Sequence, residues 1–213
     1  MGTCRFQLAV SLDGFVAGPD QTEENPLGVG GLQLHQWVFP LEVWRRQQGD
    51  EGGEVNASTP VVEEAQANVG AVVMGRNMFG GGPGPWPQDP PWNGWWGDNP
   101  PYHTPVFVLT HHSREPLEME GGTTFCFVTD GIESALEQAK QAAGDGDVLL
   151  GGGASVVQQY LAAGLVDVFE LHLVPVLLGD GERLFERVGD SLHGLELVRT
   201  VATPKVTHLR FAR

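Results

Sequence analysis

Cysteine is scarce in this chain and long apolar runs are absent, and each absence excludes a class of protein. Of 213 residues only Cys4 and Cys126 are cysteines, and neither has a second cysteine at CxxC spacing, so we expect neither a zinc site nor a disulfide framework. Both lie in strand-like apolar runs, which predicts buried thiols. Without an 18-residue apolar run or an opening signal peptide, the sequence predicts a cytoplasmic protein that does not bind a membrane.

Basic residues are also few. The chain has 12 Lys and Arg against 27 Asp and Glu, which gives a net charge of -15. Nucleic acids and anionic membrane surfaces are bound through clusters of Lys and Arg, so neither partner is expected. A small phosphorylated ligand could still bind through helix ends and a few placed arginines. Solubility alone is the simpler explanation of the acidity.

Strand-like and helix-like segments alternate along the sequence. The apolar runs at 6–10, 71–74, 106–110, 124–128 and 148–150 predict strands, and 166–178 predicts a further strand broken by Pro175. Helices are predicted over 34–46 with an interruption at Pro40, over 59–68 with Thr59 as the cap, from a cap at Asp130 to Gly144, and over 154–164. The runs at 195–201 and 206–211 predict a terminal hairpin. This order is typical of an α/β layer fold with a mixed, mostly parallel sheet, an antiparallel C-terminal hairpin and helices on both faces. We therefore expect a single domain over 1–213.

Residues 80–105 form an unusual segment. They include eight prolines, six glycines and four of the six tryptophans, a composition that no regular element tolerates. A loop of this length in a compact domain is usually functional. The tryptophans favour a packed lid that selects the substrate, or a contact between subunits.

Three consecutive glycines, Gly151, Gly152 and Gly153, follow the predicted strand at 148–150 and precede a predicted helix. A backbone without Cβ atoms can approach an anion closely, and the first N–H groups of the helix would point at it. The segment therefore predicts a phosphate site or, alternatively, a tight turn with no ligand. It is not the usual dinucleotide fingerprint, which needs a glycine at Val156.

The ordered set of motifs is more specific than any one of them. It comprises Ser11-Leu12-Asp13-Gly14-Phe15-Val16-Ala17-Gly18, Val73-Met74-Gly75-Arg76-Asn77-Met78-Phe79, Val108-Leu109-Thr110, Leu149-Leu150-Gly151-Gly152-Gly153, and Pro175-Val176-Leu177-Leu178-Gly179-Asp180-Gly181. Over about residues 5–211 the chain resembles the dihydrofolate reductase-like superfamily. Within it, the chain is similar to the reductase domain of the bifunctional riboflavin-biosynthesis deaminase/reductase. No His-x-Glu followed by Pro-Cys-x-x-Cys occurs, so we expect a stand-alone reductase without the zinc deaminase partner.

The resemblance implies a three-layer dihydrofolate reductase-like fold, a homodimer, and NADPH as hydride donor to a small pyrimidine- or pterin-like substrate. It also places Arg76, the residue after a strand-ending glycine, on the 2′-phosphate of the cofactor. A guanidinium presents fixed donors to a phosphate, which fits this role. The alternative is a surface arginine near a helix start.

The resemblance assigns the other contacts residue by residue. Gly75 and Asn77 would line the same phosphates, Leu109 and Thr110 would flank the adenosine ribose, and His111 or His112 could add a donor. Gly151, Gly152, Gly153, Ala154, Ser155 and Val156 would hold the pyrophosphate and the nicotinamide side, with a cis peptide bond at Gly151–Gly152. Ala9, Val16 and Gly18 would wall the nicotinamide.

Asp13 has two interpretations. It could be catalytic, orienting the substrate or helping to supply a proton, or it could be a structural residue of an Asp-Gly turn. For a substrate phosphate the candidates are Arg45, Arg46 and Arg183, and the nearest analogue of the carboxylate that grips a pterin is Glu42.

Three functions follow from the sequence. The first is an NADPH-dependent reductase. The second is a nucleotide-binding dimer without catalysis, in which the tryptophan-rich loop closes the substrate side. The third is a structural dimer module without a ligand.

Overall fold

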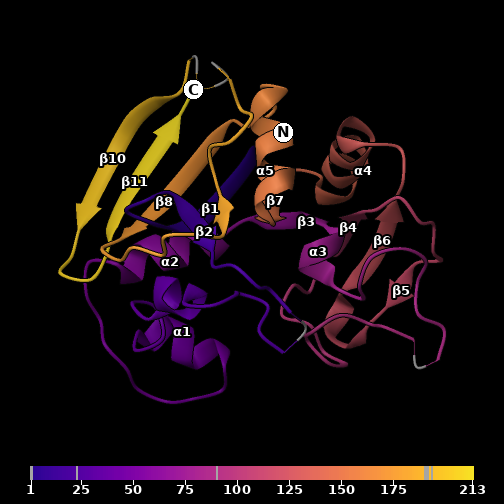
Figure 1. The fold of residues 1–213 in the computed structure, drawn as a ribbon, viewed down its shortest axis with the longest axis horizontal. Coiled ribbons are helices and arrows are strands. Elements are labelled where there is room, and N and C mark those ends of the chain that lie inside the picture. The colour runs from indigo at the N-terminus through magenta and orange to yellow at the C-terminus, as the bar shows by residue number, and fades with distance from the viewer. Residues whose placement is uncertain (1, 23, 90, 190–191, 193) are drawn as a thin grey trace. The chain divides into compact units, whose positions relative to one another are not determined.

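In a computed structural model, residues 2–22, 24–89, 91–189, 192 and 194–213 are described, and the chain divides into two compact units (Figure 1). Unit 1 comprises Met1–Phe6 and Asn68–Val166, and unit 2 comprises Gln7–Ala67 and Asp167–Arg213. In strand β1 (Cys4–Ser11), the residues up to Phe6 belong to unit 1 and those from Gln7 on belong to unit 2.

Unit 1 contains a mostly parallel sheet with strand order β1-β7-β3-β4-β6-β5. Its strands are β3 (Val69–Gly75), β4 (Pro105–Leu109), β5 (Leu117–Glu118), β6 (Thr124–Val128) and β7 (Asp147–Gly152). All neighbours pair in parallel except β5 with β6. The helices are α3 (Arg76–Phe79), α4 (Ile132–Ala143), α5 (Ala154–Ala162) and the 3-10 turn η2 (Glu120–Gly122).

Both faces of this sheet are covered. Val72, Met74, Val106 and Val108 belong to one core cluster with Phe79 of α3 and with tryptophans from the segment after it. Because successive strand residues point to opposite faces, Ala71, Val73 and Phe107 face the other way, toward α4. The Tyr160 hydroxyl of α5 donates to the Ile132 carbonyl at 2.7 Å and so ties α5 to α4.

Unit 2 contains the strand order β10-β11-β8-β1, with β8 (Val168–Val174), β10 (Glu196–Ala202) and β11 (Thr207–Ala212). The pairs β10–β11 and β11–β8 are antiparallel, and His208 lies directly opposite His172. A separate ribbon pairs β2 (Phe15–Ala17) with β9 (Glu182–Arg183). The 3-10 helix η1 (Gly31–His35), α1 (Glu42–Gln47) and α2 (Thr59–Gln66) contribute to one core cluster that includes Ala9, Leu34, Trp37, Leu41 and Val62.

The predicted fold class is confirmed, including the C-terminal hairpin and the break in the first helical segment around Pro40. Two caps are not where the sequence placed them. The cap of α2 is Ser58, with Pro60 in the first turn, and the cap of α4 is Gly131 rather than Asp130. The strands β2, β5 and β9 were not expected, because runs of two or three residues carry no periodicity. The organisation of 1–213 as one domain stays a prediction.

Cys4 is buried and Cys126 is half-buried, and neither forms a disulfide with another described residue. Burial raises the pKa of the Cys126 thiol. Within the described ranges, no helix has both the length and the apolarity needed to span a bilayer, and no three His, Cys, Asp or Glu side chains gather as a metal site.

Candidate functional site

The carboxyl ends of three neighbouring parallel strands lie at one edge of the sheet of unit 1. Met74 of β3 pairs with Gly152 of β7, and Gly75 pairs with Leu109 of β4. Loops at such an edge are the usual ligand site of an open α/β sheet. The structure therefore brings together residues that the family resemblance assigned to the cofactor phosphates and ribose.

Gly75 lies against the glycine triplet and the first turn of α5. A Cβ at Gly75 would come within 2.8 Å of Val156 Cγ2, with the Gly152 carbonyl at 3.9 Å. Gly152 has a φ of 110°, which excludes most side chains, and a Cβ built there meets nothing within 4 Å. Gly153 caps α5, so the orphan N–H groups of that helix begin beside open space. This arrangement can accept an anion.

The predicted cis bond is one residue too early. The cis peptide is Gly152–Gly153, not Gly151–Gly152, because β7 continues through Gly152. Of the residues after the triplet, Ala154 and Val156 are buried and Ser155 is exposed. Ala154 and Val156 can therefore offer little beyond backbone groups.

Arg76 is the first residue of α3, and its side chain reaches the residues that follow the helix. Its Nε donates to the Gly80 carbonyl at 3.0 Å and its Nη2 to the Gly81 carbonyl at 3.1 Å. The guanidinium carbon lies 3.2 Å from the centroid of the Trp86 ring, a cation–π contact. Nη1 is buried and has no hydrogen-bond partner among the described residues. Burial, and then the charge of Arg114, lower the pKa of Arg76.

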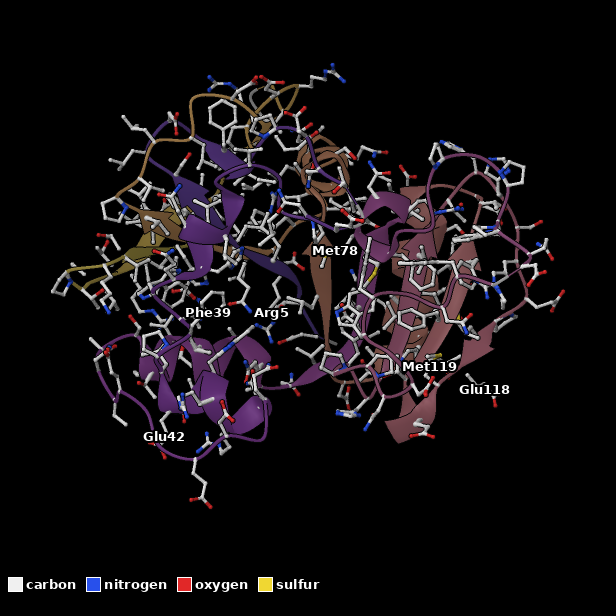
Figure 2. All side chains as sticks on the ribbon, turned by 60° about the horizontal axis from the view of Figure 1, so that its bottom comes forward. Arg5, Phe39, Glu42, Met78, Glu118 and Met119 are labelled. Carbon is white, nitrogen blue, oxygen red and sulfur yellow. The ribbon has the colours of Figure 1, made fainter. Side chains whose placement is uncertain are left out.

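The tryptophans of the 80–105 segment close the end of α3. Trp92 Nε1 donates to the Phe79 carbonyl at 2.9 Å, and Trp95 Nε1 donates to the Met78 carbonyl at 3.0 Å. Met78 itself is 36% exposed (Figure 2). Trp86, Trp92 and Trp96 pack with the aromatic residues of β6. The segment is therefore packed within unit 1, although Pro90 lies outside the described residues.

The remaining predicted residues of unit 1 differ in what they can offer. Asn77 is exposed. Thr110 is buried, and its hydroxyl accepts the backbone N–H of His112 at 3.2 Å, so the side chain closes a turn. His111 is exposed, and the His112 carbonyl accepts Trp86 Nε1 at 2.8 Å. The end of β4 is thus tied to the loop that supports Arg76.

The predicted walls of the nicotinamide, Ala9, Val16 and Gly18, all belong to unit 2. Ala9 is 6% exposed and sits in the core cluster under η1 and α1. Gly18 is enclosed by its own unit: a Cβ there would lie 1.9 Å from the Val29 carbonyl oxygen. Packing alone explains why this position is glycine.

We expect Gly18→Ala to destabilise unit 2 severely, because the added methyl group would overlap backbone that cannot move aside. The matched control in the same unit is Gly49→Ala, which has open space around the new Cβ but a φ of 83°. That variant should cost about 1–2 kcal/mol from the left-handed backbone alone. Thermal unfolding of the two variants measures the difference, and equal losses would contradict the packing role of Gly18.

Both carboxylate oxygens of Asp13 accept hydrogen bonds. Its Oδ1 accepts the Ser11 hydroxyl at 2.6 Å and the Leu178 N–H at 3.2 Å, and its Oδ2 accepts the Gly179 N–H at 2.7 Å. The Ser11 hydrogen bond, followed by those from the two backbone N–H groups, lowers the pKa of Asp13 to about 2. An ionised carboxylate cannot donate a proton at neutral pH. The geometry favours orientation over proton supply.

The candidates for a substrate phosphate are each engaged with acidic residues. The ion pairs are Arg45 with Asp50 at 3.7 Å, Arg46 with Glu63 at 3.5 Å, and Arg183 with Glu186 at 3.6 Å. Glu42 is half-buried at the start of α1 (Figure 2).

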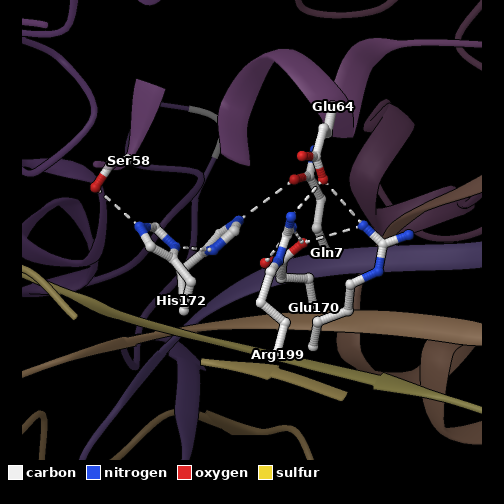
Figure 3. Close-up of polar contacts among 8 residues, drawn as sticks. Gln7, Ser58, Glu64, Glu170, His172 and Arg199 are labelled. Carbon is white, nitrogen blue, oxygen red and sulfur yellow. Dashed lines mark hydrogen bonds and ion pairs between the residues drawn. The ribbon is translucent and has the colours of Figure 1, made fainter. Parts of the chain in front are cut away.

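A buried histidine pair is the main feature of unit 2 that the sequence did not indicate. His172 Nδ1 lies 2.8 Å from His208 Nδ1, His172 Nε2 lies 3.3 Å from Gln7 Oε1, and His208 Nε2 lies 2.9 Å from Ser58 Oγ (Figure 3). The Trp37 ring is 5.0 Å from both imidazoles.

Neutral imidazoles satisfy this chain of contacts. The Ser58 hydroxyl donates to His208 Nε2, His208 Nδ1 donates to His172 Nδ1, and His172 Nε2 donates to Gln7 Oε1. If both rings were protonated, the two Nδ1 atoms would both be donors and could not hydrogen-bond each other. Burial, together with neighbouring positive charge, lowers the pKa of both histidines, that of His208 to about 4. The pair is therefore uncharged at neutral pH.

An ionic cluster lies beside the histidines on the same face of the sheet (Figure 3). Arg199 pairs with Glu64 at 2.6 Å and with Glu170 at 3.2 Å, and Arg210 pairs with Glu64 at 3.3 Å. Glu170 and His172 lie two residues apart on β8, as His208 and Arg210 do on β11, so all four side chains point to the same face of the sheet. The one sequence signal for this polar face was the period-2 placement of these residues in two predicted strands.

Comparisons with known proteins agree with this fold. The family described as the RibD C-terminal domain matches residues 3–209. An uncharacterized protein of Bacillus subtilis, YyaP, is 29% identical over 136 residues, which are 62% of this chain and 67% of that protein.

Solved structures show the same architecture at low identity. A putative riboflavin biosynthesis protein from Shewanella sp. PV-4 matches with a TM-score of 0.61 and 20% identity over 99% of this chain and 98% of its own. Dihydrofolate reductase from Enterococcus faecalis, complexed with NADP(H), matches with a TM-score of 0.53 and 16% identity over 100% of this chain and 96% of its own. A deaminase/reductase from Thermotoga maritima matches with 0.56 and 15%, and this chain covers 56% of it.

Proposed function

The chain belongs to the RibD C-terminal domain family, and from that membership and the edge of unit 1 we propose that it is an NADPH-dependent reductase of a small heterocyclic substrate. The substrate would be pyrimidine- or pterin-like, as in 5-amino-6-(5-phosphoribosylamino)uracil reductase. NADPH would supply the hydride.

The observation that carries the proposal is the set of donors at the carboxyl ends of β7, β3 and β4. Gly152 and Gly153 leave open space before α5, which suits a pyrophosphate, and Arg76 keeps a buried Nη1 without a partner among the described residues. A buried guanidinium N–H without an acceptor is costly, and a phosphate oxygen would satisfy it. These residues fit the adenosine end of NADPH.

In this proposal each predicted residue keeps a defined task. Gly75, Asn77 and the triplet with Ala154, Ser155 and Val156 would bind the phosphates, and Leu109 and Thr110 would flank the ribose. For Ala9, Val16 and Gly18 of unit 2, a place beside the nicotinamide stays a prediction from the family resemblance. Asp13, fixed and ionised, would orient the substrate or its loop rather than donate the proton.

Turnover tests the proposal directly. We expect oxidation of NADPH, followed at 340 nm, when the protein meets 5-amino-6-ribosylaminouracil, its 5′-phosphate or a dihydropteridine precursor. Because Arg45, Arg46 and Arg183 already pair with carboxylates, removing the substrate phosphate should change the rate less than about threefold, well below the loss of one charge-assisted bond. Cofactor binding without turnover of any substrate would contradict the reductase.

That contrary result would support the second candidate, a nucleotide-binding protein without catalysis. The observation that favours it is the engagement of both Asp13 oxygens by Ser11, Leu178 and Gly179. In either case we propose a cytoplasmic homodimer, which light scattering of the purified protein would show as twice the 22.9 kDa chain mass.

A further inference from the structure

Arg76 and Arg114 are neighbouring basic residues of unit 1 in an acidic chain, and among the described residues neither forms an ion pair. A carboxylate lies within 4.0 Å of each of Arg5, Arg45, Arg46, Arg183, Arg199 and Arg210. Among the described residues, neither Arg76 nor Arg114 has one. The chain has a net charge of -15, so two neighbouring arginines without an acidic partner suit the binding of an external anion.

Both guanidinium groups meet at one indole ring. Arg76 Cζ lies 3.2 Å from the Trp86 centroid, and Arg114 Cζ lies 5.4 Å from it and 5.2 Å from the Phe127 centroid. Trp86 is 7% exposed and is fixed by the hydrogen bond from its Nε1 to the His112 carbonyl. The ring therefore holds two like charges close together, and their mutual repulsion remains until an anion binds.

The 80–105 segment also fixes Arg114. Its Nη1 donates to the Trp92 carbonyl, and its Nη2 donates to Asn93 Oδ1 at 3.0 Å. These bonds use two of the five N–H donors of the guanidinium. Arg76 is anchored in the same way on the carbonyls of Gly80 and Gly81, which leaves its buried Nη1 free among the described residues.

We propose that Arg114 is a second phosphate-binding residue and that Trp86 positions it with Arg76 to select a 2′-phosphorylated adenosine. This inference rests on the proposed function. It also gives the tryptophan-rich segment a task at the cofactor, as the scaffold of a guanidinium pair, in place of the substrate lid expected from the sequence.

The test compares the binding of 2′,5′-ADP and of 5′-AMP, which lacks the 2′-phosphate, by calorimetry. Arg114→Gln should weaken 2′,5′-ADP about tenfold or more, as expected for a lost charge-assisted bond, and should change 5′-AMP less than about twofold. Arg114→Lys keeps the charge but not the planar fork of donors, so its affinity for 2′,5′-ADP should lie between those of the unmodified protein and Arg114→Gln. Lys140→Gln, an equal loss of charge in unit 1, should change neither.

Two results would overturn the inference. One is an unchanged preference for 2′,5′-ADP in Arg114→Gln. The other is an equal loss for both nucleotides in Arg114→Gln and Arg114→Lys, which would make Arg114 merely structural. If the unmodified protein itself does not distinguish 2′,5′-ADP from 5′-AMP, the proposed cofactor fails. A preference abolished by Arg76→Gln but not by Arg114→Gln would remove only the role of Arg114.

Discussion

Arg76→Gln is expected to weaken NADPH binding ten- to a hundredfold while NADH binding changes less than about twofold. A charge-assisted hydrogen bond to a phosphate is worth about 1.5–3 kcal/mol, and NADH lacks the 2′-phosphate that would receive it. The loss of affinity for NADPH should come mainly from the unpartnered Nη1, because it is the donor left for the 2′-phosphate.

The comparison with NADH separates recognition from structure. Arg76 also anchors Gly80 and Gly81, so a variant that merely loosened the loop would bind both cofactors less well. Arg76→Lys should recover part of the affinity for NADPH, because it restores the charge without the planar fork. Titration by fluorescence measures both constants. An equal loss for NADPH and NADH would show that Arg76 is only a structural residue.

Acid should destabilise unit 2 as the pH falls from about 6.5 toward 4. His208 is neutral in the folded protein, with a pKa of about 4 against 6.5 in the unfolded chain. The unfolded state therefore binds more protons between these values, so stability is full above about pH 6.5 and falls as the pH drops toward 4. His208 alone should cost on the order of 2–3 kcal/mol between pH 7 and pH 4.5.

The neighbours of the pair reinforce this direction. Burial and His208 hold the pKa of His172 low, and Arg199 opposes a charge on His208 from the adjacent strand. His35 is partly buried, and desolvation lowers its pKa. Glu170 and Glu64 are already committed to Arg199 and offer little relief.

Denaturant unfolding at pH 7, 6, 5 and 4.5 measures the loss. His208→Gln should flatten the pH dependence even if it lowers stability at pH 7, because its side chain does not titrate. The control His111→Gln removes an exposed histidine and should leave the curve unchanged. A wild-type stability that stays constant from pH 7 to pH 4.5 would contradict the neutral buried pair.

Much of the fold was predictable because its signals are local. The parallel strands β3, β4, β6 and β7 are short apolar runs bounded by glycine or polar residues, and their order identified the sheet. Helix caps were less predictable, because Ser58 and Thr59 are both good caps and only the backbone distinguishes them.

Some residues of the candidate site were likewise predictable from the sequence and others were not. The glycine triplet and Gly75 could be placed from sequence, since parallel strands must end together. The partners of Arg76 could not, because Trp86, Arg114 and the carbonyls of Gly80 and Gly81 converge through a loop without periodicity. The histidine pair joins Gln7, Ser58, His172 and His208 across 201 residues, a convergence that only tertiary structure reveals.

Titration of the unmodified protein with NADPH and, separately, NADH shows whether unit 1 holds a cofactor site that selects the 2′-phosphate, with tryptophan fluorescence as the signal. Trp86 lies under Arg76, so a phosphate drawn to that guanidinium should alter its emission. We expect saturable binding of NADPH at least ten times tighter than that of NADH. Binding of neither cofactor, or of both equally, would contradict it.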